Sequence, residues 1–421
     1  MSAGDLQGTI AAIWRIESPK LIAALSRMLR DVGRAEDLAQ DAFVVALSEW
    51  PNQGIPRNPG AWLMTAAKRR AIDQIRRDET LNRKAQRFGH ELSADALEAD
   101  VASAYEEIDD DMLRLMFVAC HPVVSQEGQV ALTLKLAGGL TTAEIARAFL
   151  TSETTIAQRI VRAKRTLAEA RVPFEVPAGA ERVQRLSSIL ETLYLIFNEG
   201  YAATAGDDVL RPELVEDALR LGRMLAALMP NESEVHGLVA LMEIQASRMR
   251  ARVGPSGDAI LLLDQDRGKW NRMLIARGLE ALTRAESLGV SLGPYALQGA
   301  IAACHARAAT PEQTDWERIV ALYDALAALA PTPVVELNRA VAVGMALGPQ
   351  AGLDIVNKLL GEPALRTYYL LPSVRADLLL KVGRASEAQI EFERAASLAR
   401  NTRDRTLLLT RAAACTMSSS A

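Results

Sequence analysis

The sequence predicts an all-α protein built from several helical domains. Hydrophobic residues make up 49% of the 421 residues, and aromatic residues make up only 5%. Apolar side chains recur at spacings near the helical period along most of the chain, and no segment alternates apolar and polar residues convincingly enough to predict a strand. Because one hydrophobic core rarely serves a chain of this length, we expect two or three domains.

A first helical unit is expected from about residue 6 to residue 87, with breaks at Gly33 and at the turn-rich PNQGIPRNPG of residues 51–60. Within it, residues 33–47 (GRAEDLAQDAFVVAL) predict an amphipathic helix. Its inward side chains are Leu38, Ala42, Phe43, Ala46 and Leu47, and its outward ones are Glu36, Asp37, Gln40 and Asp41. Such an acidic face is by default solvated, but it also suits the docking of a positively charged protein.

Residues 60–77 (GAWLMTAAKRRAIDQIRR) predict a second amphipathic helix, whose outer face is basic. One side holds Met64, Ala67, Ala71, Ile72 and Ile75, and the other holds Trp62, Arg69, Arg70, Asp73, Arg76 and Arg77. An aromatic ring among guanidinium groups suits single-stranded nucleic acid, because bases stack on the ring while cations hold the phosphates. The alternative is that Trp62 fills the core at the start of the helix and that the arginines are solvated.

A strongly acidic stretch follows this unit. Residues 91–111 contain nine Asp or Glu residues and no Lys or Arg, a composition typical of a mobile connector. Helical periodicity resumes near Met112 and continues to Arg171, where the two prolines of VPFEVPAG predict the next boundary.

Residues 141–170 predict two helices joined by a tight turn at residues 151–153. The first helix opens with Thr141 and Glu144, which have the spacing of a capping box. On the second helix Ile156, Ile160, Ala163, Leu167 and Ala170 face inward, Thr154, Thr155, Gln158, Arg162 and Arg165 face outward, and Arg159 and Lys164 lie on the flanks. The pattern fits a helix-turn-helix whose second helix enters a DNA major groove, and it fits equally an antiparallel helix pair with a solvated basic face.

From about residue 181 onward we expect helical hairpins separated by Gly and Pro. In the last hairpin the small and large residues follow a tetratricopeptide-like pattern, at Ala376, Gly383, Ala388, Phe392 and Ala395. Residues 191–204 (ETLYLIFNEGYAAT) indicate either a site or, more simply, an aromatic core cluster with Gly200 ending a helix. Residues 248–274 mix charges with a Gly-rich turn and indicate a partner surface or a long loop.

Composition argues against several classes of function. The formal net charge is only −4, so a nucleic-acid surface must come from local segregation of charge. The three cysteines are isolated and the four histidines are scattered, so we expect no disulfide framework, no metal site and no cofactor. The N-terminus shows no signal-peptide pattern, and no apolar run reaches transmembrane length. We therefore expect a cytoplasmic protein without a membrane partner.

Three stretches, in order, resemble the extracytoplasmic-function sigma factors of bacterial RNA polymerase. AEDLAQDAFVVAL is similar to the polymerase-binding helix of sigma region 2, and PRNPGAWLMTAAKRRAIDQIRR is similar to the loop and helix that recognise and melt the −10 element. LTTAEIARAFLTSETTIAQRIVRAKRTLAEAR is similar to region 4, whose second helix reads the −35 element. The helical C-terminal part resembles the tetratricopeptide-like extension of one subgroup, which is thought to take the regulatory place of a separate anti-sigma partner.

The resemblance implies sigma region 2 at residues 1–87, an acidic linker at 88–111, sigma region 4 at 112–175 and a tetratricopeptide-like regulatory domain at 176–421. It assigns core polymerase binding to Asp37, Gln40 and Asp41. Contacts with the −10 element fall to Arg57, Asn58, Arg69, Arg70, Arg76 and Arg77, beside the stacking candidate Trp62. Contacts with the −35 element fall to Thr154, Thr155, Gln158, Arg159, Arg162 and Arg165.

Under this resemblance the chain is an alternative sigma factor and not an enzyme. Its implied partners are core RNA polymerase, promoter DNA and a protein or small-molecule regulator of the C-terminal domain. One alternative is a conventional transcriptional regulator, which would bind an operator through the helix-turn-helix and sense a ligand or partner through the helical array. Another is an enzyme with its active site in that array, which is disfavoured because no acid–base or metal constellation is visible.

Overall fold

The computed structural model describes residues 3–85, 108–149, 151–202, 210–254, 259–289 and 291–418. These residues form 18 α-helices and no strand, apart from one isolated bridge between Val253 and Ala259, so the all-α prediction is confirmed. Two compact units are present, residues 1–195 and residues 196–421. Most of the predicted acidic linker, residues 88–107, lies outside the described residues. Among the described helices, none is both long enough and apolar enough to cross a membrane.

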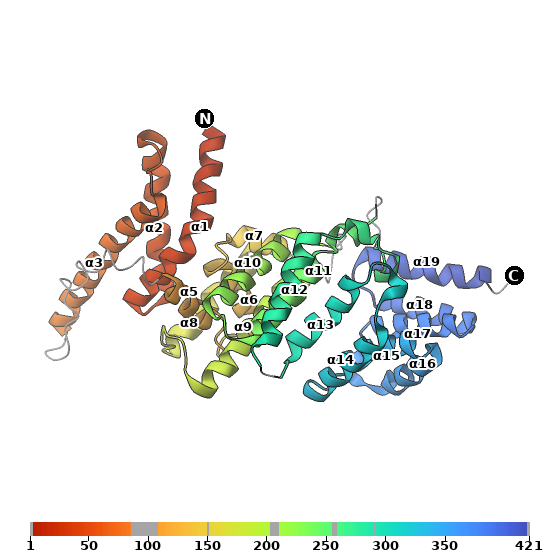
Figure 1. Cartoon of the computed structure of the whole chain (residues 1–421). Coiled ribbons are helices and arrows are strands. Elements are labelled where there is room, and N and C mark those ends of the chain that lie inside the picture. The colour runs from red at the N-terminus through yellow and green to blue at the C-terminus, as the bar shows by residue number, and fades with distance from the viewer. Residues whose placement is uncertain are drawn as a thin grey trace. The chain divides into compact units, whose positions relative to one another are not determined.

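The first unit contains two groups of packed helices, which are labelled in Figure 1. Helix α1 packs against α2, α3 and α5, whereas α6, α7 and α8 pack against one another. Their bounds are α1 (Ala3–Leu29), α2 (Val32–Gln53), α3 (Pro59–Ala85), α5 (Ile108–Ala119), α6 (Gln126–Leu136), α7 (Thr142–Ala148) and α8 (Glu153–Glu169), followed by α9 (Gly179–Tyr201), which continues into the second unit.

Small residues allow the close packing of α2 in the first unit. Ala35, Ala39, Ala42 and Ala46 are completely buried at intervals of three and four residues along its inner side. Helix α2 begins at the N-cap Asp31, whose carboxylate accepts a hydrogen bond from the backbone N–H of Arg34 at 3.0 Å. The predicted helix over residues 33–47 is therefore present and extends beyond both of its predicted ends.

The second unit is a series of helices that pack against their neighbours in the chain. Helix α11 packs against α10, α12 and α13, and the pairs α14 with α15, α15 with α16, α17 with α18 and α18 with α19 pack in turn. Their bounds are α10 (Pro212–Leu228), α11 (Ser233–Ala246), α12 (Arg272–Ser287), α13 (Pro294–Arg307), α14 (Trp316–Leu329), α15 (Pro333–Ala346), α16 (Pro349–Lys358), α17 (Leu370–Lys381), α18 (Ala385–Leu398) and α19 (Thr402–Ser418).

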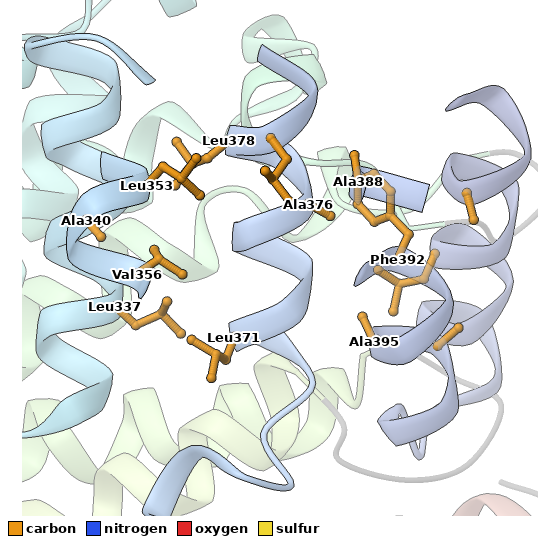
Figure 2. Close-up of a cluster of buried hydrophobic side chains, with 14 of the residues drawn as sticks. Leu337, Ala340, Leu353, Val356, Leu371, Ala376, Leu378, Ala388, Phe392 and Ala395 are labelled. Atoms are coloured by element: carbon orange, nitrogen blue, oxygen red, sulfur yellow. The ribbon is translucent and has the colours of Figure 1, made fainter. Parts of the chain in front are cut away.

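The last predicted hairpin is formed by α17 and α18. Ala376, Ala388, Phe392 and Ala395 are completely buried and belong to one hydrophobic cluster, which Figure 2 shows. Gly383 lies between the two helices with φ +82°, a conformation that glycine adopts without steric strain. The tetratricopeptide-like pattern of small and large residues is therefore confirmed for this hairpin.

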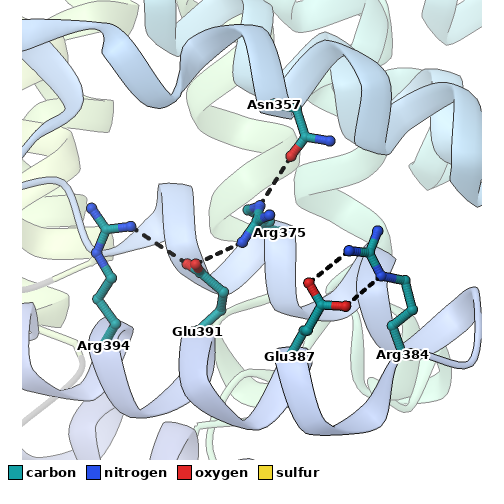
Figure 3. Close-up of polar contacts among 6 residues, drawn as sticks. All are labelled: Asn357, Arg375, Arg384, Glu387, Glu391 and Arg394. Atoms are coloured by element: carbon teal, nitrogen blue, oxygen red, sulfur yellow. Dashed lines mark hydrogen bonds and ion pairs between the residues drawn. The ribbon is translucent and has the colours of Figure 1, made fainter.

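Acidic side chains of α18 neutralise nearby arginines. Glu391 accepts a hydrogen bond from Arg375 at 2.7 Å and lies 3.7 Å from Arg394 (Figure 3). In the same view, Arg384 donates two hydrogen bonds to Glu387, at 2.7 and 2.6 Å. These arginines are paired within the helical array.

Phe197 and Tyr201 of the aromatic stretch at residues 191–204 belong to a core, whereas residues 203 and 204 lie outside the described residues. The ring of Phe197 is stacked on that of Tyr201, with 5.5 Å between centroids, and both side chains are buried. Helix α9 continues through Gly200 to Tyr201. A Cβ atom on Gly200 would lie 2.7 Å from the backbone nitrogen of Val215, so glycine at this position allows α10 to approach closely. The simpler interpretation of this stretch is confirmed, but the helix ends one residue later than predicted.

Candidate nucleic-acid interface

An acidic and apolar surface lies on the outer side of α2. Asp37, Gln40 and Asp41 are exposed as predicted. Leu47 was expected to face inward, but its side chain is 43% exposed, and Val44 is 62% exposed. We define the α2 face as these five residues. It combines two exposed carboxylates with apolar side chains.

Glu36 departs from the prediction that it is part of this outer surface. It is only 2% exposed, because α8 packs against α2 and lysines of α6 and α8 lie beside it. Its carboxylate is paired with Lys164 of α8, and Lys135 of α6 lies 3.6 Å away. Gln40 donates a hydrogen bond to the same carboxylate at 2.8 Å. A buried carboxylate is tolerated when it has such partners, so Glu36 links α2 to α6 and α8.

The loop before α3 positions two of the predicted DNA contacts. Arg57 and Asn58 are both exposed. The Oδ1 atom of Asn58 accepts a hydrogen bond from the backbone N–H of Ala61 at 3.0 Å. Asn58 therefore caps α3, which leaves its amide NH₂ group to contact a ligand.

The structure of α3 agrees partly with each of the two alternatives, in which Trp62 is either exposed for stacking or buried in the core. The Trp62 ring is half-buried and meets the Trp50 ring edge-on, with 5.4 Å between centroids. Trp62 therefore contributes to the core and still presents part of its surface. Arg69 is exposed and Arg70 is half-buried, whereas the side chains of Arg76 and Arg77 lie outside the described residues.

Helices α7 and α8 form the predicted helix-turn-helix. The backbone N–H of Thr141 donates to the Glu144 carboxylate at 2.7 Å, and the backbone N–H of Glu144 donates to the Thr141 hydroxyl at 3.2 Å, so the capping box is confirmed. Burial opposes ionisation of Glu144, but the hydrogen bonds from Thr141 hold its pKa below the ordinary value. The turn is closed by the backbone N–H of Thr151, which donates to the carbonyl of Ala146 at 3.0 Å.

Helix α8 is amphipathic in the predicted sense. Ile156, Ile160, Ala163 and Leu167 are buried, whereas Ala170 at the C-cap is exposed rather than inward. Ser152 is the N-cap and accepts a hydrogen bond from the backbone N–H of Thr155 at 3.1 Å. On the outer side Thr154, Gln158, Arg162 and Arg165 are exposed, and Thr155 and Arg159 are half-buried.

Two contacts modify this outer side of α8. Arg165 lies 3.5 Å from Glu169, but both side chains are largely exposed, and such surface pairs contribute only about 0–1 kcal/mol. Arg165 therefore remains available to another anion. Val161 was not among the predicted contacts, yet it is 65% exposed and lies on the same side as Gln158 and Arg165. The signal in the sequence is its position: Val161 is an apolar residue at helical spacing from the polar Gln158 and Arg165.

Helix α5 begins within the stretch that was expected to be a mobile connector. Asp109, Asp110 and Asp111 lie in its first turn. Asp111 is buried, and Arg27 of α1 and Arg114 contact its carboxylate at 3.1 and 2.8 Å. Burial raises the pKa of Asp111, although the two guanidinium groups act in the opposite direction. The end of the connector is therefore fixed to α1.

Comparison with known proteins gives three family matches along the chain. Sigma-70 region 2 matches residues 13–80, sigma-70 region 4 matches residues 115–167, and a family of unknown function (DUF6596) matches residues 185–286. The ECF RNA polymerase sigma factor SigK of Mycobacterium ulcerans is 29% identical over 152 residues, which is 35% of this chain and 78% of that protein. The SigK protein of Mycobacterium bovis is 28% identical over 171 residues, 39% of this chain and 87% of that protein.

The two sigma-70 matches fall in order on the helices that form the α2 face, α3 and the helix-turn-helix. The chain belongs to the extracytoplasmic-function sigma factors of the sigma-70 family. As an alternative sigma factor, it directs promoter recognition in transcription initiation. The uncharacterized protein R00370 of Rhizobium meliloti (strain 1021) is similar to this sigma factor along most of its length, with 43% identity over 387 residues, 91% of this chain and 90% of that protein. The similarity to that relative therefore extends beyond the sigma regions into the C-terminal part of this chain.

Proposed function

We propose that this sigma factor binds core RNA polymerase through the α2 face, with Asp37, Gln40 and Asp41 as its polar contacts. Exposed carboxylates steer a positively charged partner surface, and the neighbouring Val44 and Leu47 can be buried in the contact. Because Glu36 is already paired inside the first unit, its carboxylate is not assigned to polymerase.

The loop before α3 and the basic face of α3 are proposed to hold the opened strand at the −10 element. Arg57 and the free amide group of Asn58 would contact an extruded base, and the exposed part of Trp62 would support it by stacking. Arg69, Arg70, Arg76 and Arg77 are assigned to the phosphates. Since Trp62 also packs on Trp50, its ring would be held in a fixed orientation for that contact.

The outer side of α8 is proposed to read the −35 element in the major groove. One observation supports this most directly: Thr154, Gln158, Arg162 and Arg165 are exposed in register along a helix whose opposite side is buried. Half-buried Arg159 and Thr155 lie beside this row. Arginine recognises guanine edges with two hydrogen bonds, and the exposed Val161 offers an apolar contact for a thymine methyl group.

A polymerase contact that reaches beyond the exposed α2 face into the adjoining groove is proposed to require movement of region 4. A groove of about 480 Å³ is lined by Gln40 and Val44 of the α2 face and, on the region 4 side, by Lys135, Thr141 and Thr142. A polymerase surface that extended from the α2 face into this groove would have to displace these region 4 residues. We therefore propose that the described arrangement of the first unit is a closed form of the sigma factor.

The C-terminal helical unit is proposed to control the sigma regions and to respond to a protein or small-molecule regulator. No catalytic step is assigned to it. Since the proposed partners are polymerase and chromosomal DNA, we also propose that the protein acts in the cytoplasm.

Transcription by core RNA polymerase with the full-length chain tests the function. Sheared chromosomal DNA from the source organism serves as template, and sequencing of transcript 5′ ends identifies the promoters used. We expect initiation at a defined set of sites that depends on the chain and decreases in the Arg162→Ala variant. If the chain bound defined DNA sites but never associated with core polymerase, a conventional regulator would be the correct interpretation.

A further inference from the structure

Three arginines and two aromatic rings form a continuous cluster in the second unit. The Cζ atom of Arg252 lies 3.9 Å from the centroid of the Tyr201 ring, and that of Arg248 lies 5.9 Å from the same ring. The Cζ atom of Arg248 also lies 5.8 Å from the centroid of the Trp270 ring, and that of Arg267 lies 4.8 Å from it. We name Arg248, Arg252 and Arg267 the arginine cluster.

Local structure brings these residues together from separate parts of the sequence. Tyr201 ends α9, and Arg248 and Arg252 flank the short helix Met249–Ala251 that follows α11. Arg267 begins another short helix, Arg267–Lys269, which packs against the first. The backbone N–H of Asn271 donates to the carbonyl of Ser247 at 2.8 Å, which fixes the two segments side by side. The stretch at residues 248–274 is therefore ordered around the cluster wherever it is described.

Arg267 is buried among neutral partners. It is only 7% exposed, and its Nη1 atom donates to the carbonyls of His305 at 2.5 Å and Ala308 at 2.8 Å. Its Nη2 atom donates to the hydroxyl of Thr314 at 3.3 Å. These acceptors fix the position of the guanidinium group but do not neutralise its charge. Arg248 and Arg252 are half-buried and lie on the accessible side of the cluster.

Among the residues that the structure describes, the positive charge of the cluster is not balanced by nearby carboxylates. Within the described residues, none of the three arginines forms an ion pair with a carboxylate. Burial and then the charge of Arg248 lower the pKa of Arg267, and only the exposed Glu312 acts against this. Burial opposes ionisation of the Tyr201 phenol, yet the charges of Arg248 and Arg252 lower its pKa. Uncompensated like charges in a partly buried site are unfavourable, and an anion would stabilise them.

Several buried donors at the cluster have no acceptor among the described residues. The Nε atoms of all three arginines and the indole Nε1 of Trp270 make no hydrogen bond within the described part of the chain. Buried donors are normally paired, so a group of them beside unbalanced positive charge indicates a missing acceptor. The Tyr201 hydroxyl interacts with Arg248 and Arg252, but it is neutral when protonated, and the Trp270 ring likewise has no negative charge.

We propose that the arginine cluster binds the phosphate group of a small phosphorylated molecule. Guanidinium forks match phosphate oxygens with two parallel hydrogen bonds, and a phosphate monoester has about 1.5–2 negative charges, which suits a site with three cations. Arg248 and Arg252 supply the donors from the accessible side, and Arg267 supplies fixed charge beneath them. This site shares no residue with the proposed DNA and polymerase contacts, so the test of phosphate binding is independent of the tests of those contacts.

Calorimetric titration of the full-length protein tests the site. The probes are inorganic phosphate, glucose 6-phosphate and adenosine monophosphate, with glucose, adenosine and chloride at equal ionic strength as controls. We expect saturable binding of at least one phosphate-bearing probe and none of the controls. Tighter binding of an ester than of inorganic phosphate identifies a phosphorylated metabolite as the ligand, whereas equal binding identifies free phosphate. Absence of saturable binding for all three phosphate probes overturns the proposal.

Substitutions at the cluster separate specific binding from general attraction. We expect Arg248→Gln and Arg252→Gln to raise the Kd by about tenfold to a hundredfold, because each removes charge-assisted hydrogen bonds. Arg250→Gln is the matched control, since Arg250 is exposed in the same segment, and its Kd should not change. Arg252→Lys keeps the positive charge but loses the two parallel donors of the guanidinium group, so we expect it to bind phosphate more weakly than wild type. This variant provides the test if Arg252→Gln does not fold. Unchanged affinity in Arg252→Lys and Arg248→Gln overturns the assignment of these donors.

Discussion

The ammonium group of Lys164 on α8 is paired with the buried carboxylate of Glu36 on α2. The pair joins the helix proposed to read the −35 element to the helix proposed to bind polymerase. Lys135 approaches the same carboxylate to 3.6 Å, so one acidic residue balances two cations from region 4. In a closed form of the first unit, this interaction would oppose separation of regions 2 and 4.

Glu36→Gln should therefore favour the open form. The substitution keeps the shape of the side chain but leaves Lys135 and Lys164 close together without a balancing charge. We expect the full chain to bind core polymerase about tenfold more tightly, equivalent to about 1.4 kcal/mol, as measured by fluorescence anisotropy. Glu169→Gln is the control, because Glu169 is exposed on α8. Weaker polymerase binding by Glu36→Gln would show that the closed form is not what limits access.

Arg162→Ala should weaken recognition of the −35 element in a sequence-dependent way. Arg162 is exposed in the middle of the outer side of α8, where a guanidinium group can reach base edges. We expect a loss of about 1–3 kcal/mol on cognate promoter DNA and a smaller loss on random DNA, measured by competition binding of the polymerase complex. Arg277→Ala, an exposed arginine of α12, should have no effect. Equal losses on both DNAs would mean that Arg162 contacts only phosphate.

Charge reversal on the α2 face should weaken polymerase binding without unfolding the protein. Asp37→Lys with Asp41→Lys places cations where a positively charged partner surface is expected, and like charges across an interface cost several kcal/mol. We expect at least a tenfold rise in Kd for core polymerase and a nearly unchanged melting temperature, because exposed substitutions usually alter stability by less than about 0.5 kcal/mol. Glu175→Lys, an exposed reversal in the loop after α8, serves as the control. Retained binding by the double variant would assign polymerase to another surface.

The helical faces could be predicted from sequence because local periodicity determines them. Ile156, Ile160 and Leu167 are buried as their spacing requires, and the capping box at Thr141 and Glu144 is a local pattern of two residues. Glu36 could not be predicted as buried, because its partners Lys135 and Lys164 are distant in sequence. Periodicity places a residue on a side of a helix but does not say which other helix covers that side.

The arginine cluster could not be predicted from the sequence either. Residues 248–274 were singled out for their mixture of charges, but Tyr201 was assigned to a separate aromatic cluster. Only the packed structure brings the Tyr201 ring close to Arg248 and Arg252. Lone arginines in a charged loop give no local signal that their acceptors are missing.

Acidification should destabilise the second unit through His305. Burial, followed by the charges of Arg248 and Arg267, lowers the pKa of His305 from 6.5 to about 4. In the unfolded chain this imidazole takes up a proton at higher pH than in the folded protein, so stability is complete above about pH 6.5 and falls as the pH decreases toward 4. The shift corresponds to about 3 kcal/mol at most, which urea unfolding at several pH values measures.

His305→Gln isolates this contribution. The variant should lose part of the decrease in unfolding free energy between neutral and acidic pH, because glutamine does not titrate. His236→Gln replaces another histidine of the same unit, which contacts the carbonyl of Pro230 at 3.0 Å, and it should retain the wild-type pH dependence. Identical pH profiles for wild type and His305→Gln would assign the acid sensitivity to carboxylates instead.

A fragment ending at residue 175, the sequence-predicted end of region 4, should be less stable than one ending at residue 195. The first part of α9 belongs to the first unit, where Arg185 donates to the carbonyl of Phe117 at 3.1 Å and Thr192 donates to Gln129 at 3.2 Å. Removing residues 176–195 removes the donors to these acceptors and exposes apolar side chains of the first unit. Burial of one leucine side chain contributes about 1.5–3 kcal/mol to the free energy of unfolding, so this exposure lowers the stability. We expect the melting temperature of fragment 1–175 to be lower by about 6–12 °C, equivalent to about 3 kcal/mol.

The comparison decides how a truncated sigma factor can be used to test regulation. If fragment 1–195 folds cooperatively and binds core polymerase, a change in initiation relative to the full chain reports the effect of the C-terminal helices. If only fragment 1–175 loses initiation, the cause is the loss of α9 and not the loss of the C-terminal helices. Helix α9 contributes contacts to the first unit, including that of Arg185 with the Phe117 ring, 5.7 Å from its centroid. Equal melting temperatures for the two fragments would show that α9 does not stabilise the first unit, and the shorter boundary would then serve equally well.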